Sequence, residues 1–315
     1  EDCRYTQSFL VEERDSPQAR AFWDTYGFLI FHDAVSEGQC QELQDDMEDL
    51  LKERGGRLTN FGMPKGVNSL FRPALLRLRQ SENIAHIFSS LLHTSDIRVG
   101  HDRWLWHKPA PADSASPCTR RNLHLDLNPW DYVELNGSKH VQERLDKLQY
   151  GCTDRAFISE NNDVHFSMGV CIQSILSLSD ITDASNGGTI LVPGSHKTFH
   201  NWVNIADQGQ RRNRGPMQYK FDGKDRIQSL AQHPRLRRGS LLVWDQRCVH
   251  GSTPNRSQQD RLAIPLRSFP RIAMSEMRAR ERGQTVAKQI DACGFREEVT
   301  AIGRVVFGLN DNRTA

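Results

Sequence analysis

The sequence lacks the features of a membrane, disulfide-rich or strongly charged protein. No apolar run approaches the length of a membrane span, and no signal peptide is visible. The seven cysteines are scattered and odd in number, without a Cys-x-x-Cys pair, which argues against a zinc ribbon or a disulfide framework. We therefore expect reduced thiols in an intracellular compartment, most simply the cytoplasm. Because the chain starts at Glu1 rather than Met, an organelle-targeting segment removed earlier stays open.

Charge is also nearly balanced. The formal net charge of +2 gives no global field that would favour nucleic acid or a membrane surface as a partner. Short basic runs occur, such as Arg211, Arg212 and Arg214, and solvated loops explain them most simply. The composition therefore favours neither a membrane nor nucleic acid as a partner, and it does not specify an oligomeric state.

The first part of the chain is expected to supply helical support. A capping box formed by Ser36 and Gln39 precedes an apolar stripe at helical spacing, made of Cys40, Leu43, Met47, Leu50 and Leu51. Residues 74–92 carry a second stripe of this kind and predict one further helix. We assign residues 16–96 to this support region.

From residue 97 to about residue 270 the pattern changes to strand-like segments broken by turns, of which residues 97–106 are the first. Two long polar stretches interrupt it, at about residues 131–163 and 199–232, and we predict both as lids over a site. Residues 271–315 follow as a charged C-terminal helix and tail. Many short strands with few helices between them predict a closed or sandwiched antiparallel sheet, within one domain that spans the chain.

Three residues in two short segments are candidate metal ligands. Residues two apart in a strand point to the same face, so His124 and Asp126 can bind one ion from a rigid backbone. A third ligand must come from elsewhere, and His250 follows another strand-like run. Two imidazoles and one carboxylate leave other positions open, an arrangement that suits Fe(II) in oxygen-activating enzymes. The alternative without a metal is a surface or hydrogen-bonded His–Asp pair, with His250 as a turn residue.

Arg261 strengthens the metal interpretation. It lies eleven residues after His250, across an apparent turn, and offers a fixed cation where a dicarboxylate cosubstrate could anchor. A salt bridge is the alternative role for this side chain. Arg256 is closer to His250 but inside the turn, so it is the second choice for the anchor.

These motifs resemble the phytanoyl-CoA dioxygenase family of Fe(II)- and 2-oxoglutarate-dependent oxygenases. They stand in the family's order between about residues 20 and 270: HLD at 124–126, GTILVPGSH at 188–196, GSLLVW at 239–244, and HGSTPN at 250–255 followed by Arg261. The resemblance implies a mainly β protein with flanking helices. Its core would be a double-stranded β-helix, the jelly-roll or cupin-like barrel.

The resemblance also implies roles for individual residues. His124, Asp126 and His250 would bind iron, and Arg261 would pair with the distal carboxylate of 2-oxoglutarate, with Ser252 assisting. The family often has glutamine between the first two ligands, where this chain has leucine, which removes one polar contact. Halogenating relatives lack the carboxylate ligand, so Asp126 argues against halogenation.

The implied function is oxidation of a small organic metabolite with O2, by hydroxylation, desaturation or oxidative cyclisation, with release of succinate and CO2. Two alternatives stay open. One is a non-catalytic metal- or ligand-binding barrel that lost turnover, and the other is an oxygenase acting on a protein or nucleic acid. Candidate substrate contacts are Lys108, Arg121, Trp130 and His196, although ordinary polar or packing roles are simpler for each.

Overall fold

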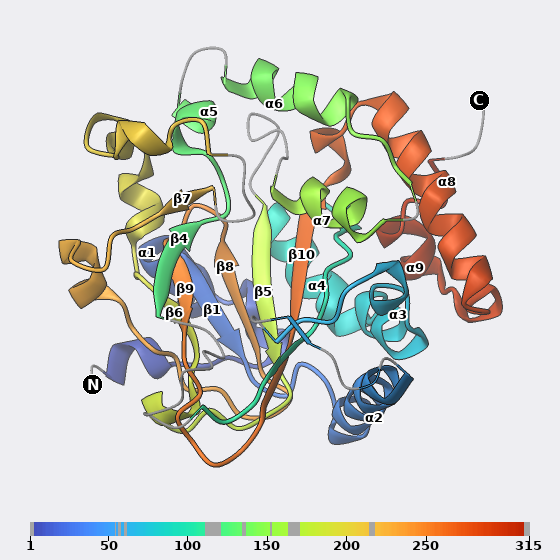
Figure 1. Cartoon of the computed structure of the whole chain (residues 1–315), viewed down its shortest axis with the longest axis horizontal. Coiled ribbons are helices and arrows are strands. Elements are labelled where there is room, and N and C mark those ends of the chain that lie inside the picture. Colours follow the sequence, from blue (N-terminus) through green and yellow to red (C-terminus); the bar gives the residue numbers. More distant parts are fainter. Residues whose placement is uncertain are drawn as a thin grey trace.

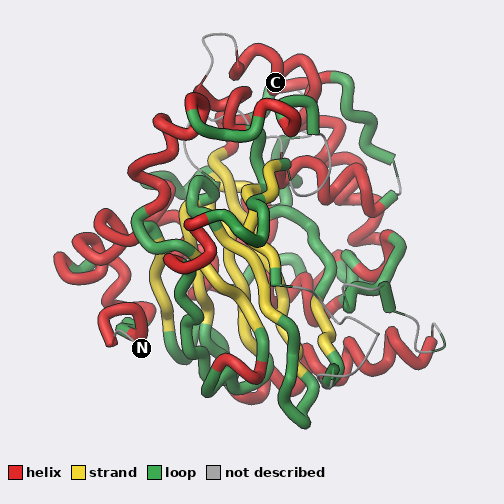
Figure 2. Tube along the Cα trace, turned by 60° about the vertical axis from the view of Figure 1, so that its left-hand side comes forward, coloured by secondary structure: helices red, strands yellow, loops and turns green. Residues whose placement is uncertain are grey.

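The core of the computed structural model is a pair of antiparallel sheets (Figures 1 and 2). The structure describes residues 3–53, 55, 58–59, 62–110, 121–133, 137–151, 153–162, 171–213 and 218–311. The larger sheet has the order β1 (Phe28–Phe31), β8 (Leu241–Asp245), β5 (Ile172–Ser177), β10 (Arg261–Pro270) and β2 (Ile97–Val99), with β3 (Leu105–His107) also paired to β10. The smaller sheet has the order β6 (Gly188–Leu191), β9 (His250–Thr253), β4 (Asn122–Leu125) and β7 (Tyr219–Lys220).

Helices flank this core, as predicted. They are α1 (Pro17–Tyr26), α2 (Glu37–Glu53), α3 (Pro73–Arg79), α4 (Glu82–Leu92), α5 (Pro129–Val133), α6 (Gly137–Asp146), α7 (Asp154–Asn162), α8 (Glu276–Ala292) and α9 (Ala301–Val306). One large apolar cluster joins α2, α4 and α8 to the larger sheet, and a smaller one, which includes Leu123, Leu125 and Trp130, lies around the smaller sheet. No helix among the described residues is both long and apolar enough to span a membrane.

Alternation along β10 separates the apolar cluster from the interior between the sheets. Leu262, Ile264 and Leu266 are buried in the large cluster with the helices. Side chains of a strand alternate between its two faces, so Arg261 and Arg267 share the opposite face. Two arginines on the inner face of a central strand are unusual, because charged side chains are rarely buried without a partner.

The capping box at the start of α2 is confirmed. The Ser36 backbone N–H donates to Gln39 Oε1 at 2.9 Å, and the Gln39 N–H donates to Ser36 Oγ at 3.3 Å. All five apolar residues predicted for the stripe are buried. Local side-chain chemistry and helical periodicity were therefore sufficient to predict this element.

The prediction of one helix over residues 74–92 is wrong, because α3 and α4 are separated at Gln80 and Ser81. The Gln80 side chain donates to the Glu298 carbonyl at 2.8 Å and accepts from the Thr300 backbone N–H at 3.0 Å. The break thus coincides with a docking contact to the C-terminal segment, which a local pattern cannot reveal.

The prediction of one strand over residues 97–106 is also wrong. The chain pairs with β10 as β2 and β3 but leaves the sheet between them. Pro265 lies in the stretch of β10 opposite this gap. The backbone carbonyls of Leu262 and Leu266 face β5, whereas the Arg267 carbonyl faces the other side and accepts from the Gly100 N–H. Backbone groups alternate between the two neighbours of a strand, so the nitrogen of Pro265, which carries no hydrogen, faces the gap.

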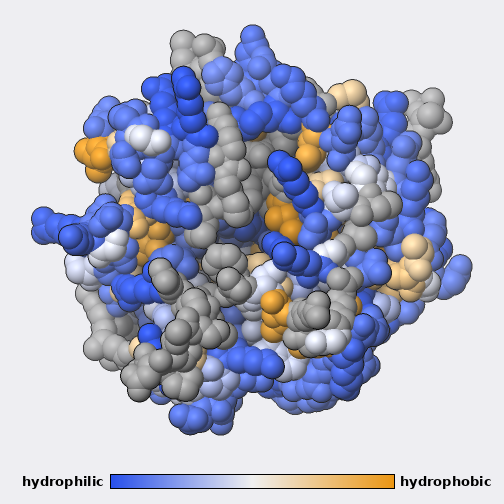
Figure 3. All heavy atoms as spheres, viewed as in Figure 1, coloured by the Kyte–Doolittle hydropathy of each residue, from blue (hydrophilic) through white to orange (hydrophobic). Residues whose placement is uncertain are grey.

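The described surface is mainly hydrophilic on the face shown in Figure 3, where hydrophobic residues form only small, separate patches. Large hydrophobic side chains that are strongly exposed are few, with Ile205 and Ile272 the most exposed. Four described cysteines, Cys40, Cys171, Cys248 and Cys293, are free thiols.

Candidate metal and cosubstrate site

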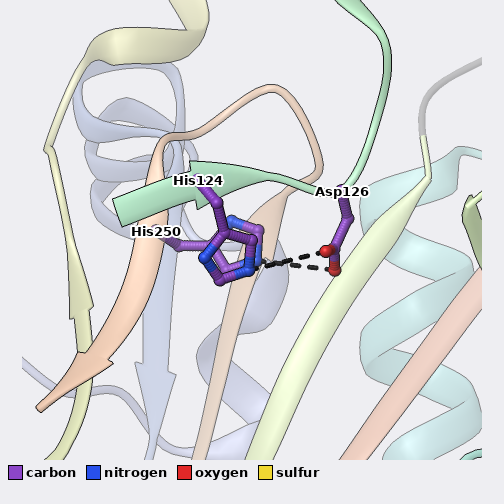
Figure 4. A group of neighbouring side chains, drawn as sticks. All are labelled: His124, Asp126 and His250. Carbon is purple, nitrogen blue, oxygen red and sulfur yellow. Dashed lines mark ion pairs between the residues drawn. The ribbon is translucent and has the colours of Figure 1, made fainter. Parts of the chain in front are cut away.

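Three side chains from two neighbouring strands of the smaller sheet converge on one point (Figure 4). His124 Nε2 lies 3.5 Å from Asp126 Oδ1, and His250 Nε2 lies 3.6 Å from Asp126 Oδ2. The ligand atoms of the three residues all lie within 4.8 Å of one another. The predicted ligands are thus brought together in a geometry that could hold a metal ion.

The pairing of β4 with β9 explains this convergence. His124 and His250 are direct cross-strand partners, so their side chains leave the sheet on the same face. Their ring centroids are 4.5 Å apart. Asp126 lies just after β4 and two residues beyond His124, on the same face by alternation.

Both imidazoles are oriented by their second nitrogen. His124 Nδ1 lies 3.0 Å from Asn122 Oδ1, and His250 Nδ1 lies 3.0 Å from the Cys248 carbonyl oxygen. These oxygens accept, so each Nδ1 carries the proton and each Nε2 presents its lone pair to Asp126 and the space beside it. Burial, and then the neighbouring His250, lowers the pKa of His124, which favours the neutral form that ligates metals.

The carboxylate of Asp126 is held from the opposite sheet. Its Oδ2 accepts from Gln173 Nε2 at 2.7 Å and from an Arg267 NH2 at 2.5 Å. Burial alone would raise the pKa of Asp126, but Arg267, followed by His124 and His250, lowers that pKa well below its usual range. Asp126 is therefore ionised, and Oδ1 is the oxygen left to face an ion.

Register across the larger sheet explains how these donors arrive. Arg267 pairs with Gln173, and Gln173 pairs with Trp244, so the three side chains form one row on the inner face. Trp244 Nε1 donates to Gln173 Oε1 at 3.1 Å, which fixes the amide. The sequence interpretation missed Gln173 and Arg267. A long polar or charged side chain inside each of two mainly apolar strands was the signal that could have found them.

Replacing Arg267 by glutamine is expected to weaken divalent metal binding by roughly 10- to 100-fold, because supporting contacts fix the orientation of a ligand. The measurement is isothermal titration of the apo-protein with Mn(II) or Co(II). Arg237→Gln, an exposed arginine before β8, is the matched control and should bind as the wild type does. An unchanged metal affinity in Arg267→Gln would show that Asp126 needs no such support.

Gly251, between the histidine and serine of β9, permits the close approach of β4. A Cβ added to Gly251 would lie 1.6 Å from the Asn122 carbonyl oxygen, and 2.6 Å from its carbon. Both atoms are backbone, so no side-chain rotation relieves the clash. The register that aligns His124 with His250 therefore depends on glycine here.

Gly251→Ala is consequently expected to lower the free energy of unfolding by roughly 3 kcal/mol or more, the upper end of the effect of overpacking, and to abolish metal binding. Thermal unfolding and Mn(II) titration measure the two effects. Gly223→Ala is the control, since a Cβ there meets nothing within 4 Å. A folded Gly251→Ala protein with normal metal affinity would show that the two strands can separate without cost to the site.

Arg261 is a buried guanidinium whose charge no acidic group contacts in the described part of the chain. It is 3% exposed, its NH1 lies 2.9 Å from His107 Nδ1, and its Nε is buried without a hydrogen-bond partner. His107 is the cross-strand partner of Arg261, and it escaped the sequence interpretation. Burial, uncompensated by a carboxylate, lowers the pKa of Arg261 to about 10.

This environment distinguishes Arg261 from the second choice for the anchor. Arg256 is exposed, and its NH1 contacts the Ala110 carbonyl oxygen at 3.5 Å. Ser252 lies two residues beyond His250, on the same face of β9, and its backbone N–H donates to Asn122 Oδ1 at 3.3 Å. A guanidinium and a hydroxyl can both donate to a carboxylate, so the role of Arg261 and Ser252 as its anchor stays a prediction.

The other predicted substrate contacts have different surroundings. Lys108 is exposed, and the exposed Arg121 donates to the Gln228 carbonyl at 2.9 Å. Trp130 is 1% exposed, inside the apolar cluster of the smaller sheet, and His196 lies against Gly27 and Cys248. Among the described residues, none of the four forms a hydrogen bond or ion pair with the metal triad, so their role as substrate contacts stays a prediction.

Residues 158–263 match the family model described as phytanoyl-CoA dioxygenase (PhyH). A protein of Dictyostelium discoideum, named putative phytanoyl-CoA dioxygenase, is 27% identical over 310 residues, which cover 92% of this chain and 86% of the relative. The match to the family model contains His250 and Arg261, and the alignment with the Dictyostelium protein covers most of the chain. The resemblance predicted from the motifs is confirmed.

Solved structures match the fold. The GlcNAc-inducible protein GIG2 of Candida albicans aligns with a TM-score of 0.63 at 11% identity, covering 99% of this chain and 78% of that one. EctD of S. alaskensis, solved with 2-oxoglutarate and 5-hydroxyectoine, aligns with a TM-score of 0.51 at 14% identity, covering 86% and 82%. The predicted jelly-roll barrel with flanking helices is confirmed.

Proposed function

We propose that this chain is a 2-oxoglutarate-dependent non-haem iron dioxygenase of the phytanoyl-CoA dioxygenase family and that it oxidises a small organic molecule. The expected outcome is hydroxylation, desaturation or oxidative cyclisation. The observation that carries the proposal is the convergence of His124, Asp126 and His250 within 4.8 Å, together with a buried Arg261 that has no acidic partner among the described residues.

His124, Asp126 and His250 would hold Fe(II), and Arg261 with Ser252 would hold the distal carboxylate of 2-oxoglutarate. The donor set fits both groups, because two neutral imidazoles and one carboxylate leave open positions and the guanidinium lacks a counter-charge. Bound Fe(II) and 2-oxoglutarate supply the activation of O2, with release of succinate and CO2. EctD, solved with 2-oxoglutarate and a small organic ligand, supports this assignment.

The residues of the chain position and protect these groups. Asn122 and the Cys248 carbonyl orient the two imidazoles, while Gln173 and Arg267 fix the carboxylate. His107 accepts from Arg261 NH1 and so fixes the guanidinium within the wall of the barrel. Preorganisation of this kind removes the need to rearrange side chains during the reaction.

We also propose that the chain works as one dioxygenase domain and that the two polar insertions cover the site. The described part of the first insertion contains α6 and α7, and α5 begins three residues after Asp126. The described part of the second contains β7, which pairs with β4 at His124. Both insertions thus start from, or attach to, the strand that carries two metal ligands.

The test is anaerobic titration of the apo-protein with Fe(II) and 2-oxoglutarate, followed by the weak visible metal-to-ligand charge-transfer band. The band is expected in the wild-type protein, and O2 should then release succinate in the presence of a substrate. A folded protein without the band would overturn the oxygenase assignment in favour of a non-catalytic barrel. Turnover of a protein or nucleic acid, with none of any free metabolite, would overturn the substrate class.

A further inference from the structure

A second buried arginine, Arg278, has no counter-charge either. It lies in the first turn of α8, is 1% exposed, and its Nε donates to the Tyr150 hydroxyl at 2.8 Å. Both terminal nitrogens, NH1 and NH2, are buried without a hydrogen-bond partner. No ion pair of Arg278 exists within the described part of the chain, so its charge is uncompensated there.

Other buried arginines in this region have plain structural roles. Arg282, one turn further along α8, donates to the carbonyls of Phe307 at 2.9 Å and Val99 at 2.5 Å. Arg79 donates to the carbonyls of Leu70 and Asp102. Both tie segments together through their terminal nitrogens. Arg278 does not, because only its Nε is engaged.

Arg278 lies at the end of the barrel that holds Asp126. Its neighbour Ala279 packs in a small cluster with Cys171, Phe269, Ala273 and Met274. Phe269 is two residues beyond Arg267 on β10, and Cys171 is two residues before Gln173, so alternation directs both towards the inner face that carries the Asp126 donors. Figure 1 shows the start of α8 near the same ends of β5 and β10.

Electrostatics agree with this placement. Burial raises the pKa of the Cys171 thiol far above its usual value, and among the charges that act on it Asp245 raises that pKa while Arg267 and Arg278 lower it. Both guanidiniums therefore act on the same buried thiol. Arg278 and Arg267, which supports the metal ligand, thus lie around one buried side chain.

The described acids at this end that face the barrel are already paired with other arginines. Asp126 contacts Arg267 at 2.5 Å, and Asp245 contacts Arg247 at 2.5 Å. Asp102 lies 4.0 Å from both Arg103 and Arg267. A buried cation without a partner is costly, and a functional ligand is a common reason for such a group to be kept.

We infer that Arg278 binds the carboxylate of the substrate, which is therefore a small organic acid with an apolar portion. With Nε engaged by Tyr150, NH1 and NH2 can donate in parallel to the two oxygens of one carboxylate. Phe269, Met274 and Cys171 form a buried apolar cluster beside Arg278, so the rest of the molecule would meet apolar side chains there. A phosphate would need more donors than one guanidinium, so a singly charged carboxylate is the better match. This inference rests on the proposed function, because the acid must lie across the same site.

The first experiment measures binding rather than turnover. Protein is kept anaerobic with Fe(II) and saturating 2-oxoglutarate, so that Arg261 is occupied, and is titrated calorimetrically with graded monocarboxylates from acetate to octanoate and with benzoate and phenylacetate. Each acid is compared with its amide, and octanoate also with octyl phosphate. We expect at least one acid to bind at least tenfold more tightly than its amide, and octyl phosphate to bind more weakly than octanoate.

Variants locate that preference. Arg278→Gln should remove the preference for acid over amide, and Tyr150→Phe should weaken acid binding severalfold. Arg280→Gln, an exposed arginine on the same helix, should bind as the wild type does. Tighter binding of every amide, or an undiminished preference in Arg278→Gln, would overturn the inference. The charge-transfer band is recorded in the same samples, so its presence alongside such a result shows that the proposed function stands and the carboxylate site does not.

Thermal unfolding of the ligand-free protein separates binding from a structural role. Arg278→Met removes an unpaired buried cation and keeps its apolar stem, so the melting temperature should stay the same or rise while acid binding is lost. A clear fall in melting temperature, with the acid preference retained in the folded fraction, would instead identify Arg278 as a structural residue like Arg282.

Discussion

Asp126→Ala is expected to abolish the charge-transfer band and to lower 2-oxoglutarate turnover by roughly 1,000-fold or more, about 4 kcal/mol in activation free energy. Asp126 supplies the only anionic atom among the three proposed ligands. In the wild-type protein the Arg267 guanidinium lies 2.5 Å from Asp126 Oδ2, so removing Asp126 also leaves this guanidinium facing the ion without a counter-charge. The variant therefore loses a ligand and gains a repulsive cation at the same point.

Anaerobic Fe(II) and 2-oxoglutarate titration, with succinate release as the second readout, measures both effects. Asp45→Ala, which removes an exposed carboxylate from α2, is the matched control and should behave as the wild type does. The double variant Asp126→Ala/Arg267→Gln tests the repulsion, and it should recover part of the metal affinity. Full activity in a folded Asp126→Ala protein would place the metal elsewhere.

Arg261→Met should weaken 2-oxoglutarate binding by roughly 100-fold, about 3 kcal/mol, because one partner of a buried charge pair is lost. The apparent KM for 2-oxoglutarate is expected to rise much more than kcat falls, since the iron ligands are intact. Metal affinity measured without 2-oxoglutarate should be unchanged. These three quantities separate an anchor for the cosubstrate from a residue that supports the metal.

Arg256→Met is the control for this prediction, because Arg256 is exposed and close in sequence. The free Arg261→Met protein should be no less stable than the wild type, since a buried and uncompensated guanidinium has been replaced by an apolar chain of similar length. If the two variants raise KM equally, or if Arg261→Met merely unfolds, Arg261 is a structural residue and the anchor lies elsewhere.

Local patterns in the sequence predicted the fold best where one segment decides its own structure. The Ser36–Gln39 capping box and the stripe behind it produced α2 as expected. The helix over residues 74–92 failed because Gln80 is held by Glu298 and Thr300, more than two hundred positions away. The strand over residues 97–106 failed because pairing with β10, and not propensity, decides where that segment leaves the sheet.

Prediction of the site residues likewise succeeded for local patterns and failed for long-range contacts. The spacing of His124 and Asp126, and the position of Arg261, could be interpreted from the chain alone. Gln173, Arg267 and His107 are harder to predict, since the role of each is defined by a cross-strand partner. Arg278 is harder still, because a lone arginine in an amphipathic helix looks like solvent-exposed charge until burial and its missing partners are known.

The spacing of residues along strand β10 decides which of its side chains face the candidate site. Arg261 at one end and Arg267 further along share its inner face only because they are six positions apart, which is an even spacing. Inserting or deleting a single residue between them would turn one of the two arginines outward, into the apolar layer beneath α4 and α8. Among natural or laboratory variants, length changes should therefore be common in the loops and nearly absent between positions 261 and 267, whatever substitutions that strand accepts.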